Sequence, residues 1–551
     1  MSSVIKDIYT TDAARQWAIF DALKTSPKNR DFDVIIIGTG AGGGFTADIL
    51  SKAGLSVALI ESGPLQSSND FNMNEQQAYQ SLYQEGGSRT TEDGAISVLQ
   101  GRAVGGTTVI NWTSCFRTPP QTLTYWQDQF GLAELDSTTM SSWFDYVEQR
   151  LGILPWQGQP NRNNAILQSG CQRLGYSSNI IARNVRGCWN LGFCGTGCPT
   201  NAKQSMLVST LPQALERGAS LIYNCEAHKI LWQDDQVTGV ECHPANGDHQ
   251  SSRFKLHARH VVLAAGAIGS PAILLRSSIP DPHQRIGRRT FLHPVSASFA
   301  LFEEAVEGFY GAPQSIYSDH FQWPADQQIG YKLEVPPLQP MLATGLLKGF
   351  GQQHRQLMQQ LPYLQCTIAL HRDGFHPQSP GGQVKLRADG SPVLNYPTTQ
   401  YLWDGVKQSL TTMARIQFAA GARSVIPSHS GAQLKKSLQA TLQQLNQLNW
   451  QPHQALLGSA HVMGGCGMSA KPESGVVNHW GEHFFLENLS VIDGSCFPTS
   501  IGANPQLSIY ALACRQAAHL SAKLGKPITL IDNDKTTQAS ERQGFALTQS
   551  I

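Results

Sequence analysis

Residues 31–63 read DFDVIIIGTGAGGGFTADILSKAGLSVALIESG, and this stretch decides the fold. Its apolar runs at 34–37 and 57–60 predict two buried strands. A glycine turn and a segment of helical length lie between them, so the stretch predicts one βαβ unit of an α/β fold. Apolar runs at 261–266 and 489–494 predict further strands, so the sheet draws on segments that are far apart in the chain.

Gly38, Gly40 and Gly43 form a G-x-G-x-x-G pattern between the first strand and the helix. Glycines there permit a tight turn and let backbone amides approach a pyrophosphate at the positive end of the helix. Glu61 ends the second strand about twenty residues on, where a carboxylate accepts hydrogen bonds from an adenosine ribose. The unit therefore predicts FAD or NAD rather than NADP, and the turn alone does not choose between the two.

The composition argues against several classes of protein. The 551 residues carry 41 basic and 40 acidic side chains with no basic block, so nothing predicts a nucleic-acid partner. No apolar run approaches the ~20 residues of a transmembrane helix. The N-terminus lacks the pattern of a secretory signal, and eleven cysteines in a long chain favour a reducing compartment. We therefore expect a cytoplasmic protein.

Two segments outside the βαβ unit predict helices. Trp17, Phe20 and Leu23 follow Thr11 at three-residue spacing, which predicts a short amphipathic helix at 12–24. Residues 340–361 are weakly amphipathic. We interpret them as a packed helix, with an entrance wall or a peripheral contact at the inner membrane as alternatives.

The stretch between about 300 and 455 has a different pattern. Short alternating segments rich in Pro and Gln predict an antiparallel sheet with helices. Within QVKLRADGSPVLNY, the pair Asp389-Gly390 predicts a hairpin turn. We assign this stretch to the substrate side of the protein.

Four ordered segments resemble the glucose-methanol-choline family of FAD-dependent oxidoreductases. They are the βαβ unit, GRAVGGTTVINW at 101–112, GAIGSPAILLRSS at 266–278, and the pair GSAHVMGGCGM and IDGSCFPTSIGANPQLSIYALA near the C-terminus. The resemblance implies a split, Rossmann-like FAD domain with an interleaved α+β substrate domain on an antiparallel sheet. We expect a helical arm at 1–30, an FAD domain at 31–115, 186–300 and 456–530, a substrate domain at 116–185 and 301–455, and a polar tail at 531–551.

The resemblance also implies a catalytic pair, His461 and Asn504. Imidazole is the natural base for a hydroxyl proton, and a neutral amide orients the hydroxyl without competing for that proton. Asn504 precedes Pro505 and an apolar segment, which also predicts an N-cap. Further FAD contacts are expected at Arg102, Gly105, Gly106, Thr107, Asn111, Gly266, Asp493, Gly494 and Pro505. The segment 101–112 contains no histidine, so we expect dissociable FAD.

Cys188, Cys194 and Cys198 lie in a glycine-rich loop with C-x5-C-x3-C spacing. The loop resembles the cysteine-rich loop of long-chain alcohol oxidases and dehydrogenases in this family. It is also similar to a loop that holds a [3Fe-4S] cluster in some sugar dehydrogenases, but those have a further cysteine where Gly187 stands. Free structural thiols are the favoured interpretation, with an iron–sulfur cluster, a zinc site or a disulfide as alternatives.

The resemblance implies FAD-dependent oxidation of an alcohol to an aldehyde or ketone, with hydride passing to flavin N5. We favour a dehydrogenase for an apolar or long-chain alcohol, with a sterol or sugar as alternative substrates. A lyase that keeps FAD without redox chemistry, like the relatives that cleave cyanohydrins, is a rival. The electron acceptor, whether quinone, oxygen or a redox protein, is left open by these motifs.

Overall fold

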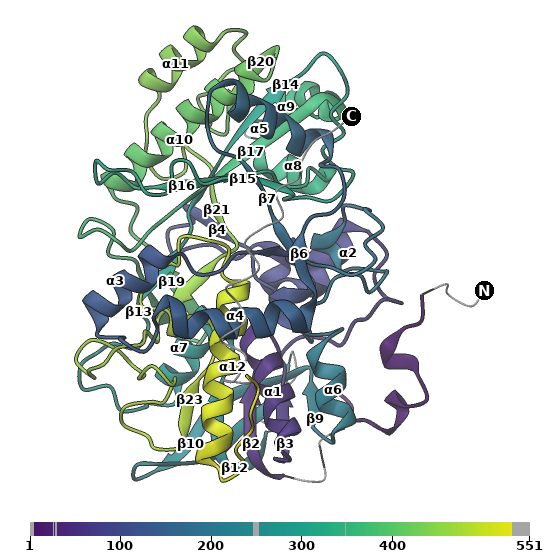
Figure 1. The fold of residues 1–551 in the computed structure, drawn as a ribbon, viewed down its shortest axis with the longest axis vertical. Helices are drawn as coiled ribbons and strands as arrows, with labels where there is room; N and C mark the ends of the chain where they lie inside the picture. Colours follow the sequence, from purple (N-terminus) through teal and green to yellow (C-terminus); the bar gives the residue numbers. More distant parts are fainter. Residues whose placement is uncertain (1–4, 26, 28–29, 246–252, 348, 532–551) are drawn as a thin grey trace, which may run out of the picture.

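The computed structural model describes residues 5–25, 27, 30–245, 253–347 and 349–531. Its first large sheet lies in the lower half of Figure 1 and follows the order β1-β9-β3-β2-β12-β11-β10, with β23 also paired to β12. The strands are β1 Ala18–Asp21, β2 Asp31–Ile37, β3 Val57–Ile60, β9 Ser220–Tyr223, β10 Cys225–Gln233, β11 Gln236–Pro244, β12 Phe254–Leu263 and β23 Leu489–Val491.

The predicted βαβ unit is present in this sheet. β2 pairs in parallel with β3 and β12, and the helix α1 (Ala41–Lys52) connects β2 to β3. Gly38 directly follows β2 in the left-handed region at φ +103°, and a Cβ there would meet the carbonyl oxygen of Ala264 at 2.3 Å. Glycine is therefore required at this position. α1 packs against the helices α6 (Thr210–Glu216) and α12 (Gln506–Lys523).

The second large sheet lies in the upper half of Figure 1 and is mostly antiparallel. Its order is β4-β21-β14-β17-β16-β15-β7, with β20 paired to β14. The strands are β4 Ile96–Val98, β7 Asn179–Ile180, β14 Val295–Leu301, β15 Ile316–Ser318, β16 Tyr331–Glu334, β17 Leu364–His371, β20 Ser424–Pro427 and β21 Leu457–Ser459. The helices α10 (Gln400–Ala419) and α5 (Arg162–Arg173) pack on it, and α11 (Leu438–Gln447) packs on α10. The predicted α/β architecture with an antiparallel second sheet is confirmed.

Smaller elements join the two halves. One sheet contains β13 Arg288–Leu292, β18 Gly382–Leu386, β19 Pro392–Asn395 and β22 Val462–Gly464, and another contains β5 Ser114–Cys115, β6 Ile153–Pro155 and β8 Ala182–Asn184. The remaining α-helices are α2 Glu75–Leu82, α3 Pro120–Phe130, α4 Ser137–Leu151, α7 Gly266–Arg276, α8 Pro340–Leu346 and α9 Gly351–Gln359. Short 3-10 helices lie at Ile8–Thr10, Ala14–Gln16, Gln84–Gly87, Gly106–Val109, Cys194–Thr196, Leu361–Tyr363 and Gly494–Cys496. The hairpin predicted at Asp389-Gly390 connects β18 to β19.

The N-terminal helix predicted at 12–24 is wrong. The segment forms the 3-10 helix Ala14–Gln16 and then β1, which pairs in parallel with β9 at the edge of the first sheet. Trp17 packs edge-on against Tyr9, and Leu23 is exposed. Main-chain pairing at an open sheet edge therefore outweighs the weak three-residue periodicity.

Two further expectations change in detail. Residues 340–361 form α8 and α9 rather than one helix. β14 begins at Val295 and pairs with β17, so this strand of the predicted FAD segment 186–300 belongs to the second sheet. The other domain boundaries stay a prediction, and the tail at 532–551 lies outside the described residues.

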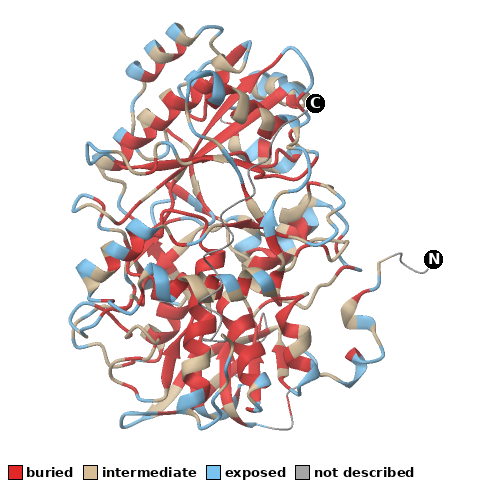
Figure 2. Ribbon diagram, in the orientation of Figure 1, coloured by how far each residue is buried: buried red, intermediate tan, exposed pale blue. Residues whose placement is uncertain are grey.

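Buried residues fill both sheets and the helices between them, whereas α11 and much of α3 carry exposed positions (Figure 2). Val34, Ile35 and Ile36 of β2 have no exposed surface, as expected for a central parallel strand. Among the described residues, no helix combines the length and apolar character needed to cross a membrane.

Candidate active site

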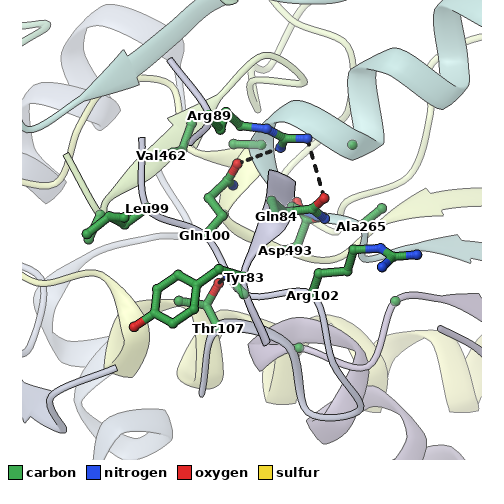
Figure 3. A pocket seen from close by; sticks show the side chains of 18 of the residues that line it. Tyr83, Gln84, Arg89, Leu99, Gln100, Arg102, Thr107, Ala265, Val462 and Asp493 are labelled. Carbon is green, nitrogen blue, oxygen red and sulfur yellow. Dashed lines mark hydrogen bonds between the residues drawn. The ribbon is translucent and has the colours of Figure 1, made fainter. Parts of the chain in front are cut away.

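A cavity of about 880 Å³ extends from the glycine turn of the first sheet to the second sheet. Gly38, Gly40 and Glu61 line one end, and His461 and Asn504 line its wall farther along. Figure 3 shows part of this lining, where Arg89 donates hydrogen bonds to Gln84 and Gln100 at 3.4 and 2.9 Å. One cavity thus connects the dinucleotide turn to the predicted catalytic pair.

The glycine turn has the shape of a pyrophosphate cradle. Gly40 stands at the N-cap of α1 with φ −70° and ψ −156°, and no side chain caps the helix. A Cβ at Gly40 would meet no other protein atom closer than Gly106 Cα at 3.9 Å, so the space in front of the helix is open. Unpaired N–H groups and the positive end of a helix face this space, which fits a dinucleotide phosphate. The residues present therefore fit the predicted cofactor.

Glu61 is buried and already holds several hydrogen bonds. Its Oε2 accepts from Thr39 N and Oγ1 at 3.1 and 2.6 Å, and its Oε1 accepts from Gly63 N at 2.9 Å. Thr39 Oγ1 in turn accepts from Gly105 N at 2.9 Å. Burial raises the pKa of Glu61, and these hydrogen bonds oppose the rise. Through Thr39, the carboxylate thus links the turn at 38–40 to the segment at 101–112 by hydrogen bonds. It also lines the cavity.

The predicted FAD residues fall into two groups. Those that line the cavity are Gly38, Gly40, Glu61, Arg102, Thr107, Asn111, Gly266, Asp493, Gly494 and Pro505. Gly43, Gly105 and Gly106 lie behind its wall and allow close backbone packing instead: a Cβ at Gly43 would stand 2.0 Å from Gly38 O. Asp493 Oδ2 accepts from Gly266 N at 2.8 Å and so joins two of the motifs.

His461 lies in the short connection between β21 and β22, and its ring contacts a second histidine. Its Nδ1 lies 3.0 Å from Nδ1 of His293, which leaves Nε2 for the cavity. Burial, and to a smaller extent the charge of Lys332, lower the pKa of His461 to about 3. The imidazole is therefore neutral at physiological pH and available as a proton acceptor.

Asn504 does not cap α12, contrary to expectation. Pro505 occupies the N-cap position, no side chain caps the helix, and Asn504 Nδ2 donates instead to Glu334 Oε2 at 3.1 Å. Glu334 is a buried carboxylate that needs donors, and the amide of Asn504 serves it instead of the first turn of the helix, which is buried as well. Asn504 Oδ1 has no hydrogen-bond partner in the described part of the chain, which leaves it available to a substrate hydroxyl.

Sequence reasoning missed the polar residues behind this pair. Glu334 is fully buried and also accepts from Gln314 Nε2 at 2.6 Å, and Gln314 Oε1 accepts from Ser114 Oγ at 2.6 Å. Burial raises the pKa of Glu334, and the charge of Lys332, two residues away on β16, opposes the rise. No local motif marks these residues: Ser114 and Gln314 line the cavity and Glu334 lies behind Asn504, and they come from segments far apart in the chain.

The family follows from two model matches. Models described as GMC oxidoreductase match residues 79–295 and 377–513. The chain belongs to the GMC oxidoreductase family. Members of this family bind FAD, so the cradle and the family agree, and the chain is an FAD-dependent oxidoreductase acting on CH–OH groups.

Known proteins similar to this GMC oxidoreductase span most of its length. An uncharacterized GMC-type oxidoreductase of Mycobacterium tuberculosis is 30% identical over 518 residues, which cover 93% of this chain and 80% of the relative. A long-chain-alcohol oxidase of Arabidopsis thaliana is 29% identical over 511 residues, covering 87% of this chain and 66% of the relative. The crystal structure of pyridoxine 4-oxidase from Mesorbium loti has a TM-score of 0.66 at 15% identity and covers 89% of this chain and 99% of its own, which supports the fold alone.

The cysteine loop of this GMC oxidoreductase is linked by hydrogen bonds to the segment 101–112, which lines the cavity. The buried Lys203 Nζ donates to Val109 O, Asn111 O and Cys194 O at 2.6, 2.8 and 2.7 Å. All eleven cysteines are free thiols. Among the described residues, no group of three or more His, Cys, Asp or Glu side chains is placed to hold a metal ion. The structure therefore gives no support to the iron–sulfur, zinc and disulfide interpretations.

Buried histidines make the stability of this GMC oxidoreductase sensitive to acid. Burial lowers the pKa of His260 and His461 to about 3 and of His371 and His483 to about 4. The unfolded chain binds protons below about pH 6.5 that the folded chain does not, so stability is full above that pH and falls as the pH drops toward 4. Each histidine contributes up to about 1.4 kcal/mol per pH unit in this window.

Urea unfolding at a series of pH values between neutral and mildly acidic conditions measures this loss. Four buried carboxyl groups whose pKa burial raises, Asp373, Glu61, Glu334 and Asp493, act in the opposite direction, but they are fewer than the histidines with a lowered pKa, which also include His228, His293 and His479. A free energy of unfolding that stays constant or rises on acidification would contradict the expected acid sensitivity.

Proposed function

We propose that this protein oxidises an apolar, long-chain primary alcohol to the aldehyde and acts as a dehydrogenase. The observation that carries the proposal is the apolar wall beside His461: the cavity is lined there by Val295, Pro336, Leu342, Leu346, Ile368 and Leu370. These side chains come from β14, β17, α8 and the segment before α8. An aliphatic chain buried against them gains roughly 0.8 kcal/mol per methylene. The similarity to a long-chain-alcohol oxidase of Arabidopsis thaliana points the same way.

The catalytic pair has separate roles in this proposal. His461 Nε2 accepts the hydroxyl proton, and Asn504 hydrogen-bonds the hydroxyl oxygen and orients the carbinol carbon. When bound, FAD supplies the acceptor for the hydride that leaves this carbon. Burial excludes bulk water and keeps His461 neutral before the proton arrives. The cytoplasmic location stays a prediction.

The flavin of the purified protein is expected to dissociate on denaturation. The segment 101–112, which forms part of the cavity wall, offers no histidine for a covalent bond. Acid precipitation followed by centrifugation should therefore leave the yellow flavin in the supernatant. Flavin retained in the washed pellet would contradict dissociable binding.

The decisive experiment is an anaerobic titration with straight-chain primary alcohols of increasing length. Loss of the yellow flavin absorbance is expected, with kcat/KM rising by up to about fourfold per added methylene until the apolar wall is covered. Sterols and sugars serve as the comparison substrates, and a cyanohydrin tests the lyase alternative. Bleaching by a sugar or sterol alone, or cleavage of the cyanohydrin without bleaching, would overturn the proposal.

A further inference from the structure

His293 meets His461 at the cavity although 168 residues separate them. His293 lies between β13 and β14, and His461 lies between β21 and β22. The same strands pair with each other on both sides of the two connections, at Leu292↔Val462 and Val295↔Gly458. Strand pairing on both sides therefore fixes the backbone positions of the two histidines, which keeps their rings next to each other.

The contact between the two rings is a hydrogen bond between like atoms. Nδ1 of His293 lies 3.0 Å from Nδ1 of His461, and the rings are nearly perpendicular at 85°. Such a contact needs one N–H and one lone pair, and each neutral imidazole has one of each. If His293 donates, Nε2 of His461 carries the proton and cannot act as a base. If His461 donates, its Nε2 presents a lone pair to the cavity.

We propose that His293 is a positioning residue that accepts a hydrogen bond from Nδ1–H of His461 and thereby holds His461 in the tautomer whose Nε2 takes the substrate proton. This inference rests on the proposed function. In the reaction the O–H bond breaks, the proton forms an N–H bond at Nε2, and the hydride leaves with the electron pair of the C–H bond to the flavin. The resulting imidazolium keeps its Nδ1–H bonded to His293 throughout.

The surroundings of His293 suit an acceptor that never becomes charged. His293 is buried, and the charges of His461, Lys332, His371 and Arg372 act on it. Burial and these charges lower the pKa of His293 well below its ordinary value, so the ring stays neutral and always has one nitrogen with a lone pair. His293 Nε2 is buried without a partner in the described part of the chain, so no competing hydrogen bond there fixes the opposite tautomer.

The first test reads the tautomer directly. The FAD-loaded protein is labelled with ¹⁵N-histidine, and the signals of His461 are assigned by their loss in His461→Ala. The expected spectrum shows a protonated Nδ1 and an unprotonated Nε2 at neutral pH. A proton on Nε2 of His461 would overturn the inference. This readout does not depend on any substrate, so it stands even if the proposed alcohol is wrong.

The second test compares two replacements of His293. Asn places Oδ1 close to the former Nδ1 and keeps an acceptor, whereas Leu leaves the Nδ1–H of His461 buried without a partner. We expect His293→Leu to slow anaerobic flavin reduction by ~10²-fold, with little change in KM, and His293→Asn to recover most of that loss. Equal rates in the two variants would show a packing role only and overturn the inference. Absence of reduction in the unsubstituted enzyme would instead refute the proposed function.

Discussion

Exchange of His461 for alanine is expected to slow flavin reduction by alcohol at least ~10²-fold while FAD stays bound. The ring is the neutral base that lines the cavity, and its pKa of about 3 keeps the lone pair available at any physiological pH. Without it the hydroxyl proton must leave to water in a buried site, where the developing alkoxide is poorly stabilised. Anaerobic stopped-flow absorbance of the holoenzyme measures the rate constant directly.

A matched control removes a histidine elsewhere in the FAD half. His257 is exposed on β12 and does not line the cavity, so His257→Ala should reduce at the rate of the unsubstituted enzyme. The flavin content of both variants is compared first, because a variant that has lost FAD cannot report on the role of His461 in flavin reduction. A His461→Ala enzyme that retains FAD and is reduced at the normal rate would remove His461 from the mechanism.

The parts of the fold that the sequence predicted are those in which one local signal suffices. The apolar runs at 34–37 and 57–60 are central parallel strands, and such strands are buried on both faces and need no alternation. The glycine spacing succeeded because Gly38 has a positive φ and no room for a Cβ, and because Gly40 leaves the space in front of α1 open. The helix predicted at 12–24 failed because spacing alone does not reveal that a sheet edge lies nearby.

The candidate site was predictable only where a motif carried it. His461 and Asn504 stand in recognisable segments, and both line the cavity. His293, Lys332 and Glu334 have no such signal: His293 follows β13, and Lys332 and Glu334 lie within the short strand β16, where polar residues are common. The contact of His293 with His461 arises from pairings between strands more than a hundred residues apart, which no short window of sequence contains.

The replacement Gly40→Ala is expected to lower the affinity for FAD by about 10- to 10²-fold without unfolding the protein. The backbone at Gly40 has φ −70°, which alanine adopts readily, and the added Cβ would stand 3.9 Å from Gly106 Cα, its nearest protein neighbour. What the methyl group displaces is the pyrophosphate, which must approach the N–H groups of α1 closely to accept their hydrogen bonds. Each charge-assisted bond weakened in this way costs about 1.5–3 kcal/mol.

Two comparisons separate this effect from a general loss of stability. Gly345→Ala on α8 also adds a methyl group in open space, but away from the turn, and should leave FAD affinity unchanged. Gly43→Ala should destabilise the protein itself, because its Cβ would stand 2.0 Å from Gly38 O. Titration of the flavin-free protein with FAD, followed by flavin fluorescence, gives the affinity, and thermal unfolding without FAD gives the stability. Unchanged FAD affinity in a folded Gly40→Ala protein would mean that the pyrophosphate does not lie at the N-terminus of α1, and the dinucleotide assignment of the turn would fail with it.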